Sequence, residues 1–269
     1  MRKPLHVTTW DDGAAHGAPA VFVHGILTWA TDERYGFGAQ RELARERRLL
    51  MTDRRGYGQS PDTGRSDFEE DAEDLVKVLE SAGGPAGSPA HLVGHANGGL
   101  AALIAAGRRP DLVRSLALIQ PSVFRVAADR APVRALYERV AESSGPPPGL
   151  SPEEFLRAST EGIGMEPPEP TPARLRAART SMGERGVWEA DPALAPVRDA
   201  PWPVLVISGD WTGAPPLYRE YAGEALMAAA EALTDALAAR HLRVPGYYPH
   251  TQQPALVNAG LRELWAKTG

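Results

Sequence analysis

Residues 94–99, with the sequence Gly-His-Ala-Asn-Gly-Gly, constrain the fold of this chain more than any other stretch. The apolar residues 90–93 lead into them, and a run of small apolar residues, 100–106, leads out. Glycines at such positions let a strand turn sharply into a helix, because they tolerate tight backbone conformations and close packing. The pattern therefore predicts a buried strand, a sharp turn centred on Ala96 and a helix that packs closely behind it.

Segments with strand and helix patterns alternate on both sides of this turn. Strands are expected near residues 6–10, 19–25, 49–53, 115–119, 202–209 and 241–245, and helices near residues 40–47, 68–82, 217–239 and 254–267. The central strands are apolar without alternation, as expected for strands covered on both faces. We therefore predict an α/β protein in which helices cover both faces of a mostly parallel sheet.

The alternation is interrupted after Pro121. Residues 122–200 contain prolines throughout and form a stretch too long for a loop in a compact domain. Short helical patterns occur in it near residues 131–142, 152–160 and 172–183. We expect residues 1–121 and 201–269 to form the core, with residues 122–200 inserted into it as a helical lid.

Composition and spacing exclude several kinds of site and partner. The chain has no cysteine, its seven histidines are dispersed, and it has no glycine-rich phosphate loop, so we expect no metal and no cofactor. A net charge of −5 with scattered arginines argues against nucleic acid as a partner. No apolar run approaches the ~18 residues of a membrane helix, and no apolar leader is visible, so we expect a cytoplasmic protein without a membrane partner.

Four motifs together resemble those of α/β-hydrolase-fold enzymes. They are His24-Gly25, residues 53–61 (Asp-Arg-Arg-Gly-Tyr-Gly-Gln-Ser-Pro), residues 94–99, and residues 203–209. They follow the order and spacing of that family across most of the core. The resemblance implies the α/β-hydrolase fold, with position 96 as the position of the serine nucleophile. Ala96 offers only a methyl group there, which cannot attack a carbonyl carbon.

The resemblance also implies two backbone donors and an acid. The oxyanion hole would be formed by the N–H of Asn97 and by the N–H of either Ile26 or Leu27. The acid of a catalytic triad would follow the strand that ends at Gly209. Asp210 is the carboxylate present in that loop and is either the acid or a turn residue.

The usual positions of the acid and of the base hold other residues. Thr212 stands where the acid is often found, and the preceding strand ends in Gln120. The base would be a histidine in the loop after the last strand. Without an insertion in that loop the base position is Tyr247, and with a small insertion it is His250.

Aromatic residues are expected around a pocket at the carboxyl edge of the sheet, where ligands bind in this fold. The side chains that we expect to line it are His24, Trp29, His95, Phe124, Trp188, Trp211 and Tyr248. Such a pocket suits a small molecule or a peptide with apolar groups.

The resemblance leaves three functions open. The chain is similar to atypical α/β-hydrolase-fold enzymes that lack the triad and tailor natural products, such as the peptide epimerase of bottromycin-type biosynthesis. That similarity implies cofactor-free proton transfer next to a carbonyl, for example epimerisation of a ribosomal peptide. The second function is a serine hydrolase of the esterase or lactonase type, inactivated by alanine in place of serine at position 96. The third is a non-catalytic small-molecule binding protein.

Overall fold

The computed structural model describes residues 2–13, 17–83, 88–143, 145 and 149–268. Within these described residues, seven strands form one sheet in the order β1-β3-β2-β4-β5-β6-β7. The strands are β1 (Val7–Trp10), β2 (Ala20–Val23), β3 (Leu49–Thr52), β4 (Ala90–His95), β5 (Val113–Ile119), β6 (Val204–Gly209) and β7 (Arg240–Val244). Among the described strands only β1 is antiparallel to its neighbour, so the predicted mostly parallel sheet is confirmed.

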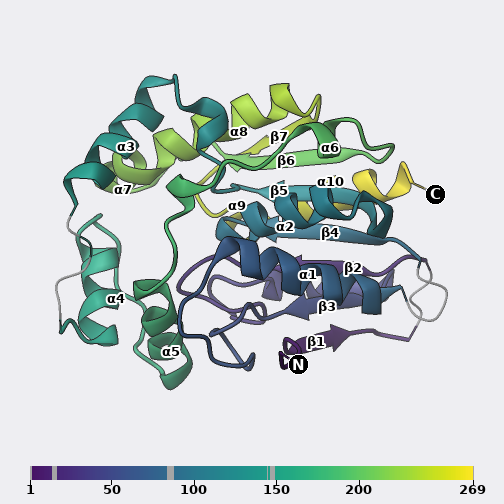
Figure 1. Cartoon of the computed structure of the whole chain (residues 1–269), viewed down its shortest axis with the longest axis horizontal. Coiled ribbons are helices and arrows are strands. Elements are labelled where there is room, and N and C mark those ends of the chain that lie inside the picture. The colour runs from purple at the N-terminus through teal and green to yellow at the C-terminus, as the bar shows by residue number, and fades with distance from the viewer. Residues whose placement is uncertain (1, 14–16, 84–87, 144, 146–148, 269) are drawn as a thin grey trace.

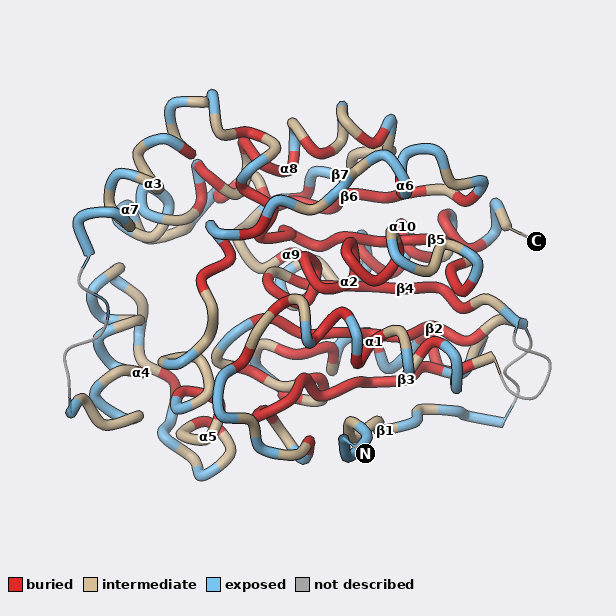
Figure 2. Tube along the Cα trace, in the orientation of Figure 1, coloured by how far each residue is buried: buried red, intermediate tan, exposed pale blue. Residues whose placement is uncertain are grey.

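Helices cover both faces of this sheet (Figure 1). Apolar residues of α1 (Phe68–Ala82), α2 (Asn97–Arg108) and α8 (Glu224–Ala236) form one core cluster with the sheet. The opposite face is covered by the 3-10 helix η1 (Gly38–Arg45) and by α10 (Pro254–Ala266), which follows the short helix α9 (Pro249–Gln252). Figure 2 shows buried residues concentrated along the central strands, which explains their unbroken apolar sequences.

The helix expected over residues 217–239 is present over residues 216–236, but it contains a π-helical turn that the sequence did not predict. Its first part consists of α7 (Pro216–Tyr218) and a π-helical turn η6 (Arg219–Gly223), and α8 follows. A Cβ on Gly223 would lie 2.5 Å from the ring of Trp211. The indole therefore packs directly against the backbone at the point where the helix changes its geometry.

The segment between β5 and β6 leaves the sheet. It contains the 3-10 turn η4 (Arg125–Ala127), α3 (Ala131–Glu142), α4 (Pro152–Glu161), α5 (Pro172–Met182), the 3-10 turn η5 (Val187–Glu189) and α6 (Ala195–Arg198). Figure 1 shows α3, α4 and α5 gathered beyond one end of the sheet, while α6 returns beside α2. We call residues 122–200 the insertion.

The turn between β4 and α2 depends on two glycines. A Cβ on Gly94 would lie 2.6 Å from the carbonyl oxygen of Gly98. A Cβ on Gly98 would lie 2.3 Å from the carbonyl oxygen of His24. Ala96 at the apex has a φ of 50° and a ψ of −119°, a conformation that an L-residue rarely adopts. The predicted sharp turn is thus present, held between β2 and β5.

Candidate active site

A cavity of about 400 Å³ lies between the carboxyl ends of the strands and the insertion. Apolar and aromatic side chains of the insertion and of η6 form one side, among them Phe155, Leu156, Ile163, Trp188 and Tyr221. The described residues that line it include no Asp, Glu, Lys or Arg. Because burying an unpaired charge in such surroundings is unfavourable, the cavity suits a neutral ligand.

Backbone amide groups remain available beside the apex of the turn. Asn97 is the first residue of α2, and the N–H groups of a first helical turn have no partner within the helix. Among the described residues, no hydrogen bond is made by the N–H of Ile26, which borders the same cavity. The N–H of Leu27, by contrast, donates to Oγ of Ser181 at 3.1 Å. Of the two alternatives in this loop, Ile26 has the open donor.

Asp210 makes the hydrogen bonds of a turn residue. Its Oδ1 accepts hydrogen bonds from the backbone N–H groups of Thr212 at 2.8 Å and of Gly246 at 3.0 Å. The Thr212 bond is the largest of the effects that lower the pKa of the Asp210 carboxyl group. Asp210 and Thr212 are both absent from the residues that line the cavity.

A glutamine joins the loops that would carry the acid and the base. Gln120 directly follows β5 and has a φ of 43°, a backbone conformation that L-residues rarely adopt. Its Oε1 accepts a hydrogen bond from the N–H of Gly209 at 3.0 Å, and its Nε2 donates to the carbonyl oxygen of Tyr247 at 3.2 Å. The neutral amide therefore fixes these loops without supplying a carboxylate.

Neither candidate for the base lies on the cavity wall. The ring of Tyr247 packs against those of Trp211 and Tyr248, at centroid distances of 6.2 and 5.2 Å. His250 is fully buried behind His95, with 4.3 Å between their ring centroids. The imidazole that does border the cavity is His95, and burial lowers its pKa well below the usual value, so it is neutral at pH 7.

Some of the side chains that the sequence predicts to line the pocket do so. His95, Phe124, Trp188 and Tyr248 line the cavity as expected. The structure corrects the expectation for His24, Trp29 and Trp211, which do not line it.

Each of these three side chains has another environment. His24 is buried, and its Nε2 accepts a hydrogen bond from the N–H of Arg54 at 2.9 Å. The ring of Trp29 lies 4.8 Å from the guanidinium group of Arg174, and Trp211 is buried against Tyr218. All three side chains therefore stabilise the loops around the cavity and do not form its wall.

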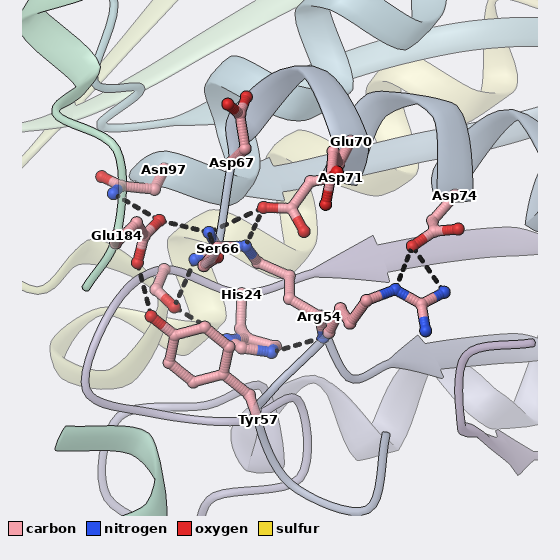
Figure 3. Close-up of polar contacts among 12 residues, drawn as sticks. His24, Arg54, Tyr57, Ser66, Asp67, Glu70, Asp71, Asp74, Asn97 and Glu184 are labelled. Atoms are coloured by element: carbon pink, nitrogen blue, oxygen red, sulfur yellow. Dashed lines mark hydrogen bonds and ion pairs between the residues drawn. The ribbon is translucent and has the colours of Figure 1, made fainter. Parts of the chain in front are cut away.

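A buried network of charged groups joins the insertion to the core (Figure 3). The guanidinium group of Arg54 pairs with Asp71 at 2.7 Å and also with Glu184 of the insertion. Glu184 in addition accepts hydrogen bonds from Nδ2 of Asn97 at 3.0 Å and from the hydroxyl of Tyr57 at 2.5 Å. Burial raises the pKa of Asp71 to about 6. No sequence pattern indicated this network, since its members lie on four segments: the loop after β3, α1, α2 and the insertion.

The buried histidines predict how stability depends on pH. Burial lowers the pKa of His250 from its usual 6.5 to about 4. Between these values the unfolded chain binds more protons than the native one, so the free energy of unfolding falls as the pH falls, by up to ~1.4 kcal/mol per pH unit for this group. Chemical denaturation between pH 7 and pH 4 checks this, and His250→Gln should flatten the profile. An unchanged profile in the variant would show that His250 is not buried in its neutral form.

The comparisons with known proteins agree with this architecture. The model of the alpha/beta hydrolase family matches residues 20–259. The chain is 34% identical over 112 residues to the sn-1-specific diacylglycerol lipase of Mus musculus, covering 41% of this chain and 35% of that protein. It is 35% identical over 108 residues to the dihydrolipoyllysine-residue acetyltransferase component of the acetoin cleaving system of Pseudomonas putida, covering 40% of this chain and 28% of that protein. The matches thus span about a third of the length of these relatives.

Solved structures of similar fold cover almost the whole chain. A thermophilic esterase from Thermogutta terrifontis has a TM-score of 0.62 at 23% identity, over 98% of this chain and 93% of that one. The enol-lactonase from Burkholderia xenovorans has a TM-score of 0.59 at 17% identity, over 97% and 96%. No described helix is long and apolar enough to cross a membrane. With the family model matched over nearly all of the core, the chain belongs to the alpha/beta hydrolase family.

Proposed function

We propose that this member of the family binds a neutral, largely apolar carbonyl compound and promotes proton transfer at the carbon beside the carbonyl, without acyl transfer. One observation carries the proposal. The open backbone donors of Ile26 and Asn97 border an uncharged cavity in which the nucleophile position is Ala96. Two such donors would stabilise negative charge on a ligand oxygen.

The two backbone donors would stabilise the oxygen of an enolate in proton transfer as well as that of a tetrahedral intermediate in hydrolysis. Hydrolysis needs a nucleophile and a base close to it, and positions 96, 212 and 247 hold Ala, Thr and Tyr. An enolate needs stabilisation of its oxygen and a proton acceptor of modest strength. Epimerisation of a peptide at an α-carbon belongs to this class of reaction, and a peptide with apolar side chains suits the lining.

A binding protein without turnover is the second candidate. It is favoured by the low pKa of His95, the imidazole at the cavity wall, because a weakly basic imidazole is a poor proton acceptor. The similarity to an esterase and a lactonase favours the third candidate, a hydrolase inactivated at position 96 alone. The three are separated by two measurements: ester hydrolysis after restoration of the serine, and hydrogen exchange in a bound ketone.

Ala96→Ser should leave the hydrolysis of para-nitrophenyl butyrate within about tenfold of the parent protein. In serine hydrolases the nucleophile contributes on the order of 10⁶ in kcat, and most of that is lost without its base. The measurement is the release of nitrophenolate by equal concentrations of folded parent and variant, with thermal unfolding as the control for the fold. A burst of nitrophenolate equal to the variant's concentration would contradict the proposal and support the inactivated hydrolase.

A further inference from the structure

A chain of hydrogen bonds leads from the cavity wall to a buried carboxylate. Ser181, near the end of α5, lines the cavity, and its Oγ lies 3.0 Å from the hydroxyl oxygen of Tyr57. That hydroxyl lies 2.5 Å from Oε2 of Glu184. Tyr57 is fully buried, and the side chain of Glu184 is 6% exposed. Neither of them lines the cavity, so Ser181 is the member of the chain that a ligand meets.

The count of donors fixes the direction of these hydrogen bonds. The carboxylate of Glu184 only accepts, so Tyr57 gives its single hydroxyl proton to it. Ser181 must then donate to the oxygen of Tyr57. The oxygen of Ser181 accepts the N–H of Leu27, and a hydroxyl oxygen has a second lone pair. Ser181 is therefore able to take up a proton from the cavity while it passes its own proton inward.

We infer that Glu184, reached through Tyr57 and Ser181, is the proton acceptor for a ketone or peptide α-carbon held in the cavity. This inference rests on the proposed function. The C–H bond of the α-carbon breaks and its proton goes to Oγ of Ser181, while the Ser181 proton moves to Tyr57 and the Tyr57 proton to Glu184. The electron pair of the C–H bond forms the C=C bond of an enolate. The enolate oxygen lies at the N–H groups of Ile26 and Asn97, and the reverse path returns a proton to carbon.

The surroundings keep each group in the form that this path needs. The guanidinium group of Arg54 and Nδ2 of Asn97 both donate to the carboxylate of Glu184, which fixes its orientation toward the hydroxyl of Tyr57. Burial and the charge of Glu184 raise the pKa of Tyr57 well above its usual value, so Tyr57 remains a neutral hydroxyl. A carboxylate of only modest basicity suffices as the base when an oxyanion hole stabilises the enolate.

The path from Ser181 through Tyr57 to Glu184, which we call the relay, also gives the insertion a role in the reaction. Ser181 and Glu184 both belong to it, whereas Tyr57 and the oxygen-binding amides belong to the core. The path is complete only when α5 is docked, so α5 both covers the ligand and supplies the first proton-carrying group. Of these residues Ser181 contacts the ligand directly, while Tyr57 and Glu184 are positioning residues that act through it.

The test uses benzylacetone, a neutral apolar ketone, and the full chain in D₂O. The parent protein should exchange the α-hydrogens of benzylacetone for deuterium faster than buffer alone, as measured by proton NMR. Ser181→Ala, Tyr57→Phe and Glu184→Gln should each reduce the catalysed exchange at least about tenfold. The Kd for benzylacetone should stay within about twofold in the same variants, because the hydroxyls and the carboxylate pass protons rather than hold the ketone.

The controls separate the relay from a structural role and from the proposed binding. Glu189→Gln, an exposed acid of the same segment paired with Arg185, should exchange at the parent rate. If Glu184→Gln does not fold, Ser181→Ala still tests the relay, because Ser181 is only half-buried. Unchanged exchange in Ser181→Ala and Tyr57→Phe would overturn the relay. Binding of benzylacetone without exchange above buffer would overturn the relay and leave a binding protein, and the absence of binding would overturn the proposed function itself.

Discussion

Gly98→Ala should destabilise the protein by at least about 3 kcal/mol, because the added carbon has no space. It would lie 2.3 Å from the carbonyl oxygen of His24, 2.5 Å from Cγ1 of Val23 and 2.7 Å from the Val23 carbonyl oxygen. Two of these atoms are backbone at the end of β2, so no side-chain rotation relieves the clash. Either β2 or α2 must move, and both position the donors of the candidate active site. Urea denaturation measures the loss.

Gly107→Ala in the same helix is the matched control. Its added carbon would lie 3.6 Å from the nearest atom, Cγ2 of Val197, which is an ordinary contact. Since alanine favours a helix over glycine by roughly 0.5–1 kcal/mol, this variant should be as stable as the parent or more stable. Equal stabilities of the two variants would mean that β2 and α2 do not pack as closely as the structure has them.

Arg54→Leu should destabilise the protein by about 3–5 kcal/mol, since it leaves buried carboxylates without their cation. The side chains of Arg54 and Asp71 are 1% and 3% exposed, and Glu184 is 6% exposed. Without the guanidinium group, two acids face each other in a region of low polarity. The insertion should also dock more weakly, because Glu184 makes one of its buried ionic contacts with the core, another being the Arg174–Asp32 pair. The unfolding free energy and limited proteolysis within the insertion report the two effects.

Arg55→Leu provides the comparison for this variant. Arg55 is 6% exposed and pairs with Asp74 at 2.8 Å, but Asp74 keeps a second cation, Lys77, at 3.5 Å. The loss of Arg55 should therefore destabilise the protein less than the loss of Arg54. Adding Glu184→Gln to Arg54→Leu should recover part of the stability, because it removes one unpaired charge. A double variant that is less stable than Arg54→Leu would refute this electrostatic explanation.

The fold was predictable from sequence because its signals are local. Glycines at 94 and 98, apolar runs of strand length and the interruption after Pro121 each act over a few residues, and the structure has the corresponding turn, sheet and insertion. The helix near residue 220 was predicted, but its π-helical turn was not, because the packing of Trp211 against Gly223 is a tertiary contact without a local pattern.

The candidate site was predictable only where its residues belong to the core motifs. His95, Asn97 and Ile26 follow directly from the turn and from the loop after β2. Glu184 and Ser181 were missed, since they meet Arg54 and Tyr57 across separations of 130 and 124 residues. The aromatic side chains of Trp29 and Trp211 lie in the correct loops but point into the loop packing, which composition alone does not reveal.

The cavity should accept a neutral carbonyl compound at the apex of the turn. Calorimetric titration with benzylacetone and with hydrocinnamate, its carboxylate analogue of nearly the same shape, measures this preference. The ketone should bind, the carboxylate should bind at least about tenfold more weakly because the described lining residues include no cation, and Ala96→Leu should abolish ketone binding. Equal or tighter binding of the carboxylate, or ketone binding unaffected by Ala96→Leu, would contradict it.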